Sequence, residues 1–389
     1  MLGIAVATLC TVAGTSIASA EPFTVVGGGS YGSLADAVAG APSGATIDVA
    51  AGTYVDQSAS IPTGDILTIQ SVGGTAVFDA VSRLANSQGI IKTFGDLTVR
   101  GLEFENAAIT DALGGNGAGI RYKKGDLTVL NSVFLNNQEG ILGDADPAGT
   151  IVIDHSTFAG NGNVTDLSGH EHAIYVTKIN SLTVENSTIT GTKGAGSDVQ
   201  SRAAQTTVVN NVMDDGTTSR ANYAVNLPNG GQALIEGNLI EKGPLTTNHR
   251  IVAYGAAGAG ALYSENSLTV TGNTFTSTDP LAIGIDIFAP DSPTATLSSN
   301  VYNGTFQHEI VEPSGDLSYP PSDPGGTSPD PVPEPGSVSL FLGALVGLIG
   351  ARASTARMRA GVDRCSSSDH LRREARIAFT QRECPESGR

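Results

Sequence analysis

A short motif recurs through the chain and constrains its fold more than any other feature. It reads LTVRGLEFEN from Leu97 and LTVLNSVFLNN from Leu127. Further copies start at Ile151, Leu182, Thr206, Ala233, Leu268 and Ala295, and a fainter one starts at Leu67. Successive copies begin 24–35 residues apart. A period of this length predicts a solenoid or a propeller.

Each copy of the motif contains two apolar positions that lie five residues apart, such as Val129 and Phe134. On one straight strand, residues five apart face opposite sides, so both can be buried only if the chain bends between them. The positions between them hold Gly, Asn, Ser or His, for example Asn131 and Ser132. These residue types suit a left-handed bend. We expect the Asn and Ser positions to stack into structural ladders.

A third short apolar segment precedes most copies, as in GIIKTF from Gly89, GIRYKK from Gly119 and AIYVTK from Ala173. Three short strands per period, stacked like on like, predict an all-β fold: a right-handed parallel β-helix of about ten coils. A propeller would need four strands per blade. Residues Leu34 to Ala39 form a short amphipathic segment, which we expect to cap the first coil.

The two ends of the chain differ in composition from the repeats. Residues 1–20 are apolar and end in Ala18-Ser19-Ala20, which is typical of a secretory signal peptide. We predict a β-helix domain over residues 21–317 and an extended linker over residues 318–335, where seven prolines occur. No Cys occurs between Cys10 and Cys365, so the exported domain is expected to have no disulfide.

Residues 336–359 combine an apolar run with Arg352, Arg357 and Arg359, directly after Val332-Pro333-Glu334-Pro335. This arrangement resembles the PEP-CTERM sorting signal of bacterial exported proteins. The resemblance implies processing by an exosortase, transient membrane contact through the apolar segment, and delivery to the cell surface or the extracellular matrix. Residues 360–389 show no core pattern and are expected to be a disordered tail.

The charge of the exported part limits its partners. Residues 21–335 contain 12 Lys and Arg against 33 Asp and Glu, which gives a net charge of −21. Nucleic acid is therefore an unsuitable partner. Half of these 12 basic residues lie between positions 121 and 202, which indicates a local basic surface: Arg121, Lys123, Lys124, Lys178, Lys193 and Arg202. Such a surface suits an extracellular acidic polysaccharide.

Lys123, Lys178 and Arg202 each lie four residues before a motif copy, so we expect them in one outer column. His170, His172 and Tyr175 lie in the adjacent segment GHEHAIYV. Removal of the proton beside a uronate carboxylate needs a base, a cation and an acid. His170, His172, Tyr175, Lys178 and Arg202 are therefore the candidate catalytic residues, with Arg121, Lys123, Lys193, Asn226 and Asn229 as candidate substrate-binding residues.

Residues 169–258 resemble a group of bacterial right-handed β-helix repeat proteins, through Gly169-His170, Ser201-Arg202-Ala203 and Pro228-Asn229-Gly230-Gly231. Ser197, Gln200, Asn226 and Ala257 stand where that group has His, Lys, Glu and Glu. The wider superfamily includes pectate lyases and mannuronan epimerases. The resemblance thus implies the fold, and a polyuronate lyase or C5-epimerase by analogy.

Several alternatives stay open at this stage. Asp144 with Asp146, and Asp214 with Asp215, resemble the acid pairs of polygalacturonase-type glycosidases, although the motif order differs from that family. Asp144, Asp146 and Asp198 are candidates for binding Ca²⁺, whereas zinc at His170 and His172 lacks an evident third ligand. The chain has no Trp, so charge is expected to dominate sugar binding. A non-catalytic structural or adhesive rod is the main alternative to an enzyme.

Overall fold

The computed structural model describes residues 21–82, 84, 88–109, 116–162, 171–246, 248–288 and 294–311. The predicted signal peptide, linker, sorting segment and tail lie outside these residues, as does His170. Within the described part of the chain, no helix is long and apolar enough to cross a membrane.

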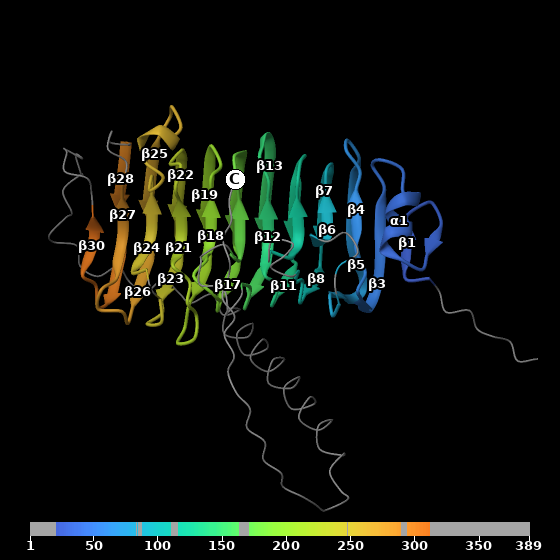
Figure 1. Cartoon of the computed structure of the whole chain (residues 1–389), viewed down its shortest axis with the longest axis horizontal. Coiled ribbons are helices and arrows are strands. Elements are labelled where there is room, and N and C mark those ends of the chain that lie inside the picture. Colours follow the sequence, from blue (N-terminus) through green and yellow to red (C-terminus); the bar gives the residue numbers. More distant parts are fainter. Residues whose placement is uncertain are drawn as a thin grey trace, which may run out of the picture. The chain divides into compact units, whose positions relative to one another are not determined.

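A ten-stranded parallel sheet runs through the stacked coils (Figure 1). Each of its strands pairs with the strand one coil later, which agrees with the predicted ten coils. In chain order the strands are β4 (Ala59–Ile61), β6 (Gly89–Thr93), β9 (Ala118–Tyr122), β12 (Glu139–Gly143), β15 (Ile174–Val176), β18 (Ser197–Ser201), β21 (Tyr223–Leu227), β24 (Arg250–Tyr254), β27 (Ile283–Ile287) and β30 (His308–Val311).

The second sheet has 20 strands and contains the two halves of every motif copy. The first halves are β7 (Asp96–Arg100), β10 (Leu127–Leu130), β13 (Asp146–Asp154), β16 (Ile179–Glu185), β19 (Gln205–Val209), β22 (Gln232–Glu236), β25 (Ser267–Thr271) and β28 (Thr294–Ser298). The second halves are β8 (Leu102–Glu105), β11 (Val133–Leu135), β14 (Thr157–Ala159), β17 (Thr188–Thr190), β20 (Val212–Asp214), β23 (Leu239–Lys242), β26 (Thr274–Ser277) and β29 (Val301–Gly304). The first two coils have one long strand each, β3 (Thr46–Val55) and β5 (Ile66–Asp79), in place of separate first and second halves.

The bend between the two halves has the predicted left-handed backbone. Its φ angle is +50° at Asn131, +49° at His155 and +64° at Gly101, and it is positive at the matching residue of every copy from Leu97 onward. Gly, Asn, His and Ser occupy these positions because other residue types would pay a steric cost there. The prediction of a bend is confirmed.

From Ser132 onward, the residue after each bend forms the predicted ladder. Asn238 is fully buried, and its side-chain oxygen accepts hydrogen bonds from the backbone N–H of Asn211 (2.8 Å) and from the Asn211 amide (3.0 Å). The Asn238 amide in turn donates to the Asn273 side chain and to the Val208 carbonyl. Each rung thus satisfies the backbone of its neighbour, which fixes the register of successive coils.

The apolar positions of the motif meet inside the coils. Phe78, Phe104, Phe134 and Phe158 stack in that order, with ring centroids 5.9, 5.0 and 4.5 Å apart. All four are fully buried. Since each ring lies at the same position of successive coils, the core is built by repetition of one contact.

The first coil is covered at its end, as expected. Helix α1 (Leu34–Gly40) is capped by the Ser33 side chain and buries Leu34, Ala37 and Val38. Strands β1 (Phe23–Val25) and β2 (Ser30–Tyr31) pair antiparallel with each other, and β1 also pairs with β3. This cap shields the first coil from water and from edge-to-edge pairing.

Three strands of the ten-stranded sheet were not predicted: β4, β12 and β30. Strand β12 reads EGILG, and its first residue, Glu139, is a buried carboxyl where the two preceding strands have Gly89 and Ala118. A charged residue followed by glycine does not indicate a strand by periodicity. Strand β12 forms because it pairs with the neighbouring strands β9 and β15.

We predict that Asn238→Ala lowers the free energy of unfolding by roughly 3 kcal/mol, because several buried backbone and side-chain groups lose their partners together. Chemical denaturation of the purified protein would measure the change. The control is Asn180→Ala, since Asn180 is exposed on β16 and its loss should cost less than about 0.5 kcal/mol. Equal losses for both variants would show that the ladder adds no special stability.

Candidate functional site

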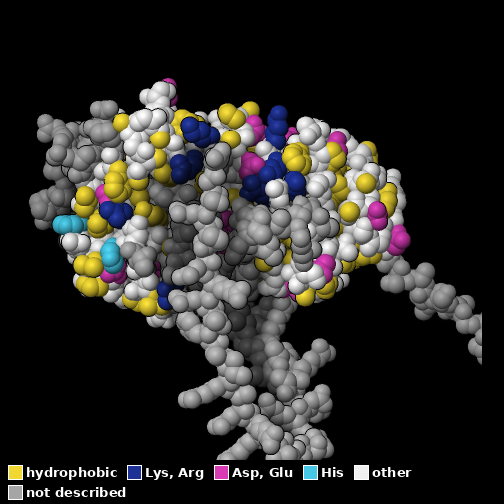
Figure 2. Space-filling model, viewed as in Figure 1, with side chains coloured by type: hydrophobic (Ala, Val, Ile, Leu, Met, Phe, Trp, Pro, Cys, Tyr) yellow, Lys and Arg dark blue, Asp and Glu magenta, His cyan; other side chains and the backbone are white. Residues whose placement is uncertain are grey.

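One outward-facing position of the ten-stranded sheet forms a continuous column of side chains. Register partners on β6, β9, β12, β15, β18 and β21 place them in this order: Lys92, Arg121, Leu142, Tyr175, Gln200 and Asn226. We call this set the outer column. Neighbouring members are about 4.8 Å apart at the backbone, the spacing of paired strands. On the face shown in Figure 2, Lys and Arg side chains gather over the middle coils.

Two cations near the start of the outer column share one carboxylate. Arg121 forms a salt bridge with Asp144, and the Lys123 ammonium lies 2.7 Å from the other oxygen of the same carboxyl. The Arg121 Nε atom is buried and has no hydrogen-bond partner among the described residues. With Lys92 alongside, positive charge exceeds negative charge here, although the protein as a whole is acidic.

The structure corrects the predicted basic strip. Backbone hydrogen bonds align Lys123 with Asp144, then Thr177, then Arg202. Asp144 therefore separates Lys123 from the two later cations. Lys178 is exposed. Between the register pairs Val176–Ser201 and Ser181–Gln205, the earlier coil has one residue more than the later coil. Because of this bulge, Thr177 and Lys178 both lie opposite Arg202. The strip is two groups of cations rather than one column.

Arg202 and Asn229 are held by the protein itself. The Arg202 guanidinium donates to the Asn229 side-chain oxygen (2.6 Å), and the Asn229 amide donates to the Ala261 carbonyl (2.6 Å). Asn229 is only 2% exposed. This geometry corrects the prediction that Asn229 contacts substrate: both residues anchor the loop over residues 255–266.

His172 and Tyr175 lie together, but only one of them faces outward. Their ring centroids are 5.0 Å apart. His172 is 2% exposed, and its Nδ1 atom accepts a hydrogen bond from the backbone N–H of Ser197 (2.8 Å). A buried ring cannot touch a polymer in solvent, so His172 is better placed to support Tyr175 than to act as a base. Tyr175 is half-buried in the outer column.

Behind the outer column lies a buried carboxyl that the sequence did not indicate. Glu139 is fully buried, and one of its oxygens accepts the His172 backbone N–H (3.0 Å). Burial raises the pKa of Glu139 well above its ordinary value, and the nearby Glu171 raises it further, whereas the hydrogen bond from His172 and the charge of Arg121 act in the opposite direction. The sequence signal that could have revealed it is a carboxyl at a position where the two preceding coils have Gly89 and Ala118.

A family model described as a right handed beta helix region matches residues 88–275 and, in a second match, residues 162–311. Together these matches span more than half of the chain. The chain belongs to this right-handed β-helix family. No curated protein sequence matches it.

Among solved structures, the chain is similar to a variant of the PL6 family alginate lyase AlyGC, with 19% sequence identity and a TM-score of 0.41. The similarity covers 69% of this chain and 38% of that one, so the chain spans less than two fifths of the enzyme's length.

The remaining predicted binding residues of this β-helix protein lie at separate places. The Lys193 ammonium donates to the Asn136 side chain (2.9 Å), and burial lowers its pKa. Lys193 precedes β18, whereas Arg202 follows it, so the two cations lie at opposite edges of the sheet. The Asn226 amide donates to the Gln200 side-chain oxygen (3.0 Å) within the outer column.

The acidic candidates for calcium and glycosidase sites fall into two separate groups, and each group includes a basic side chain. Asp144 pairs with Arg121 and Lys123, while Asp146 accepts the Gly125 backbone N–H (2.9 Å). Asp198 and Asp215 are buried near Lys242, and burial raises the pKa of both carboxyls. In the ranges that the structure describes, no group of three His, Cys, Asp or Glu side chains could hold a metal ion.

We predict that Glu139→Gln changes the pH dependence of stability. The folded-state pKa of Glu139 lies above its ordinary value of 4.5, so the folded protein loses stability as pH rises from there toward the folded pKa. The variant lacks this loss, so its free energy of unfolding relative to the native protein should increase from pH 4.5 into the neutral range. Urea denaturation across this range would measure it.

The control is Glu236→Gln, which removes one carboxylate from an exposed position on β22. A stability difference between Glu139→Gln and the native protein that stays constant across the same pH range would contradict the assignment of a titrating carboxyl at Glu139.

Proposed function

We propose that this protein is exported and binds extracellular acidic polysaccharide along the outer column. The observation that carries the proposal is the register of β6 and β9, which sets the partly buried Lys92 and Arg121 side by side on the outward face of the sheet. Two adjacent cations on an otherwise acidic protein attract an anionic chain and orient it.

The rest of the outer column supplies contacts of other kinds. Tyr175 offers an aromatic ring, and the partly exposed Gln200 offers an amide that can exchange hydrogen bonds with sugar hydroxyls. Asn226 is only 8% exposed and supports the Gln200 side chain by a hydrogen bond. Because one side chain recurs about every 4.8 Å along the column, a polymer lying parallel to the helix axis would meet a new contact at each coil. A repeating ligand therefore suits this surface better than a small molecule.

Lyase or C5-epimerase chemistry is the catalytic form of this proposal. Both reactions begin with removal of the proton next to the uronate carboxylate. A lyase then breaks the C–O bond to the leaving sugar and forms a double bond, whereas an epimerase returns a proton to the opposite face. Tyr175 would transfer the proton, and Arg121 or Lys178 would stabilise the charge that develops on the carboxylate.

A structural or adhesive rod is the second candidate, and the outer column itself favours it. Leu142 separates Arg121 from Tyr175 with an apolar side chain, and Gln200 and Asn226 are hydrogen-bonded to each other. Neutral amides at these two positions cannot supply a catalytic charge. In this form the protein would hold acidic polymers in the matrix without altering them.

The proposal includes the route to that location. The signal over residues 1–20 would direct export, and an exosortase would process the segment over residues 336–359 after its transient contact with the membrane. Calcium would bridge the acidic polymer and the acidic surface of the protein, so binding and cleavage are both to be measured with and without it.

We predict that Lys92→Ala/Arg121→Ala weakens binding to polygalacturonate or alginate by roughly tenfold, because two charge contacts are lost. Isothermal titration calorimetry at low and high salt would measure it, and salt should weaken the native interaction. Asp144 keeps Lys123 as a partner in this variant. The matched control is Arg100→Ala, an exposed Arg on β7 of the other sheet, and equal losses in both variants would place binding elsewhere.

We predict that incubation with acidic glycans produces unsaturated uronates, detected as a rise in ultraviolet absorbance, if the protein is a lyase. Tyr175→Phe should then abolish the rise and leave the melting temperature unchanged, since the Tyr175 hydroxyl forms no hydrogen bond with the described residues. No rise on any glycan excludes a lyase on that panel. NMR of the recovered polymer then distinguishes an epimerase from a binding protein.

A further inference from the structure

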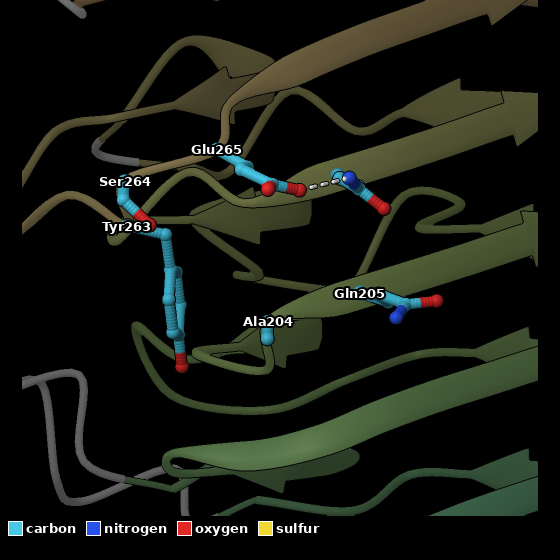
Figure 3. Close-up of a pocket in the computed structure, with 6 residues that line it drawn as sticks. Ala204, Gln205, Tyr263, Ser264 and Glu265 are labelled. Carbon is cyan, nitrogen blue, oxygen red and sulfur yellow. Dashed lines mark hydrogen bonds between the residues drawn. The ribbon is translucent and has the colours of Figure 1, made fainter.

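A small pocket lies on the twenty-stranded sheet, between the starts of β19 and β22 and the loop before β25 (Figure 3). Its volume is about 160 Å³. Its lining residues are Ala204, Gln205, Gln232, Tyr263, Ser264 and Glu265. Pockets for drug-sized ligands occupy about 300–1,000 Å³, so this pocket suits a ligand no larger than one ring.

The wall formed by Tyr263 is rigid. The Tyr263 hydroxyl donates to the Arg202 backbone carbonyl (2.8 Å), and the Tyr263 backbone N–H donates to the Asn229 carbonyl (3.2 Å). Asn266 donates its side-chain amide to the Tyr263 carbonyl. Because the hydroxyl proton is already engaged, Tyr263 has no donor left for a ligand and offers it mainly the face of its ring.

The facing wall is polar and already partly organised. Gln205 and Gln232 are register partners on adjacent strands, so their side chains lie about 4.8 Å apart at the backbone. The Gln232 amide donates to the Glu265 carboxylate (2.9 Å). The Gln205 side chain is exposed and forms no hydrogen bond with the described residues, which leaves its amide donor and acceptor available to a ligand.

We propose that this pocket binds one neutral sugar ring. An aromatic face packs against the C–H groups of a sugar, and the paired amides with one carboxylate match neighbouring hydroxyls that both donate and accept. Glu265 has no salt bridge within the described part of the chain, so its negative charge disfavours a uronate. The ligand class therefore differs from the acidic polymer proposed for the outer column.

The site does not depend on that proposed function, because no residue of the outer column lines the pocket. Arg202 links the structure of the two regions: it directly follows β18 of the ten-stranded sheet, and its carbonyl and guanidinium hold Tyr263 and Asn229. Arg202, predicted from the sequence as a catalytic cation, thus holds the wall of the sugar pocket. Arg202→Ala would disturb the pocket although Arg202 does not line it.

Saturation-transfer NMR with the purified full chain would test the proposal, using glucose, galactose, mannose and glucuronate as separate probes. At least one neutral sugar should bind, and glucuronate should bind roughly tenfold more weakly. Tyr263→Ala should weaken neutral-sugar binding roughly tenfold. Gln205→Ala should weaken it as well, while it leaves the hydrogen bonds of the loop intact.

The matched control is Gln70→Ala, which removes an outward-facing Gln from β5 of the same sheet, far from the pocket in the coil order. This control should keep full affinity. Glu265→Gln should let glucuronate bind about as tightly as the neutral sugar. Absence of binding by any neutral sugar, unchanged binding in Gln205→Ala, or equal binding of glucuronate by the native protein would overturn the proposal.

Discussion

The Asn and Ser ladder at the left-handed bend is the interaction on which the rest of the structure depends. A parallel coil has no tight hairpin to set its register, so an internal device must do so. The side chains of Asn211, Asn238 and Asn273 each bind the backbone of the preceding coil while they are buried. A slip of one residue would break every rung and turn the apolar side chains out of the core.

The fixed register turns a linear repeat into surfaces with defined chemistry. Residues that lie 21 to 33 positions apart, such as Arg121, Leu142 and Tyr175, become neighbours in the outer column. The length of each coil between ladder rungs decides which loop residues meet. Asp144 therefore comes beside Lys123, and the positive charge of the face is reduced at that point.

The loop over residues 255–266 adds a feature that the repeat alone does not supply. Asn229 and Asn266 bind its backbone, and Arg202 holds both Asn229 and the hydroxyl of Tyr263. Buried polar contacts of this kind stabilise one loop conformation, since breaking them would leave unpaired groups. The coils thus provide a rigid platform on which a loop forms a pocket of different chemistry.

The sequence alone determined the coil architecture, because the ladder, the bend and the stacked Phe residues are all local patterns that recur with one period. It also indicated the cap at Leu34 and the region of basic residues. Only the tertiary structure decided that His172 is buried, that Asp144 interrupts the cations and that Arg202 anchors a loop. Those facts depend on contacts between different coils, whose alignment is set by loop lengths and a bulge at Thr177 and Lys178. The buried Glu139 belongs to the same class, because its environment comes from the neighbouring coil and not from its own strand.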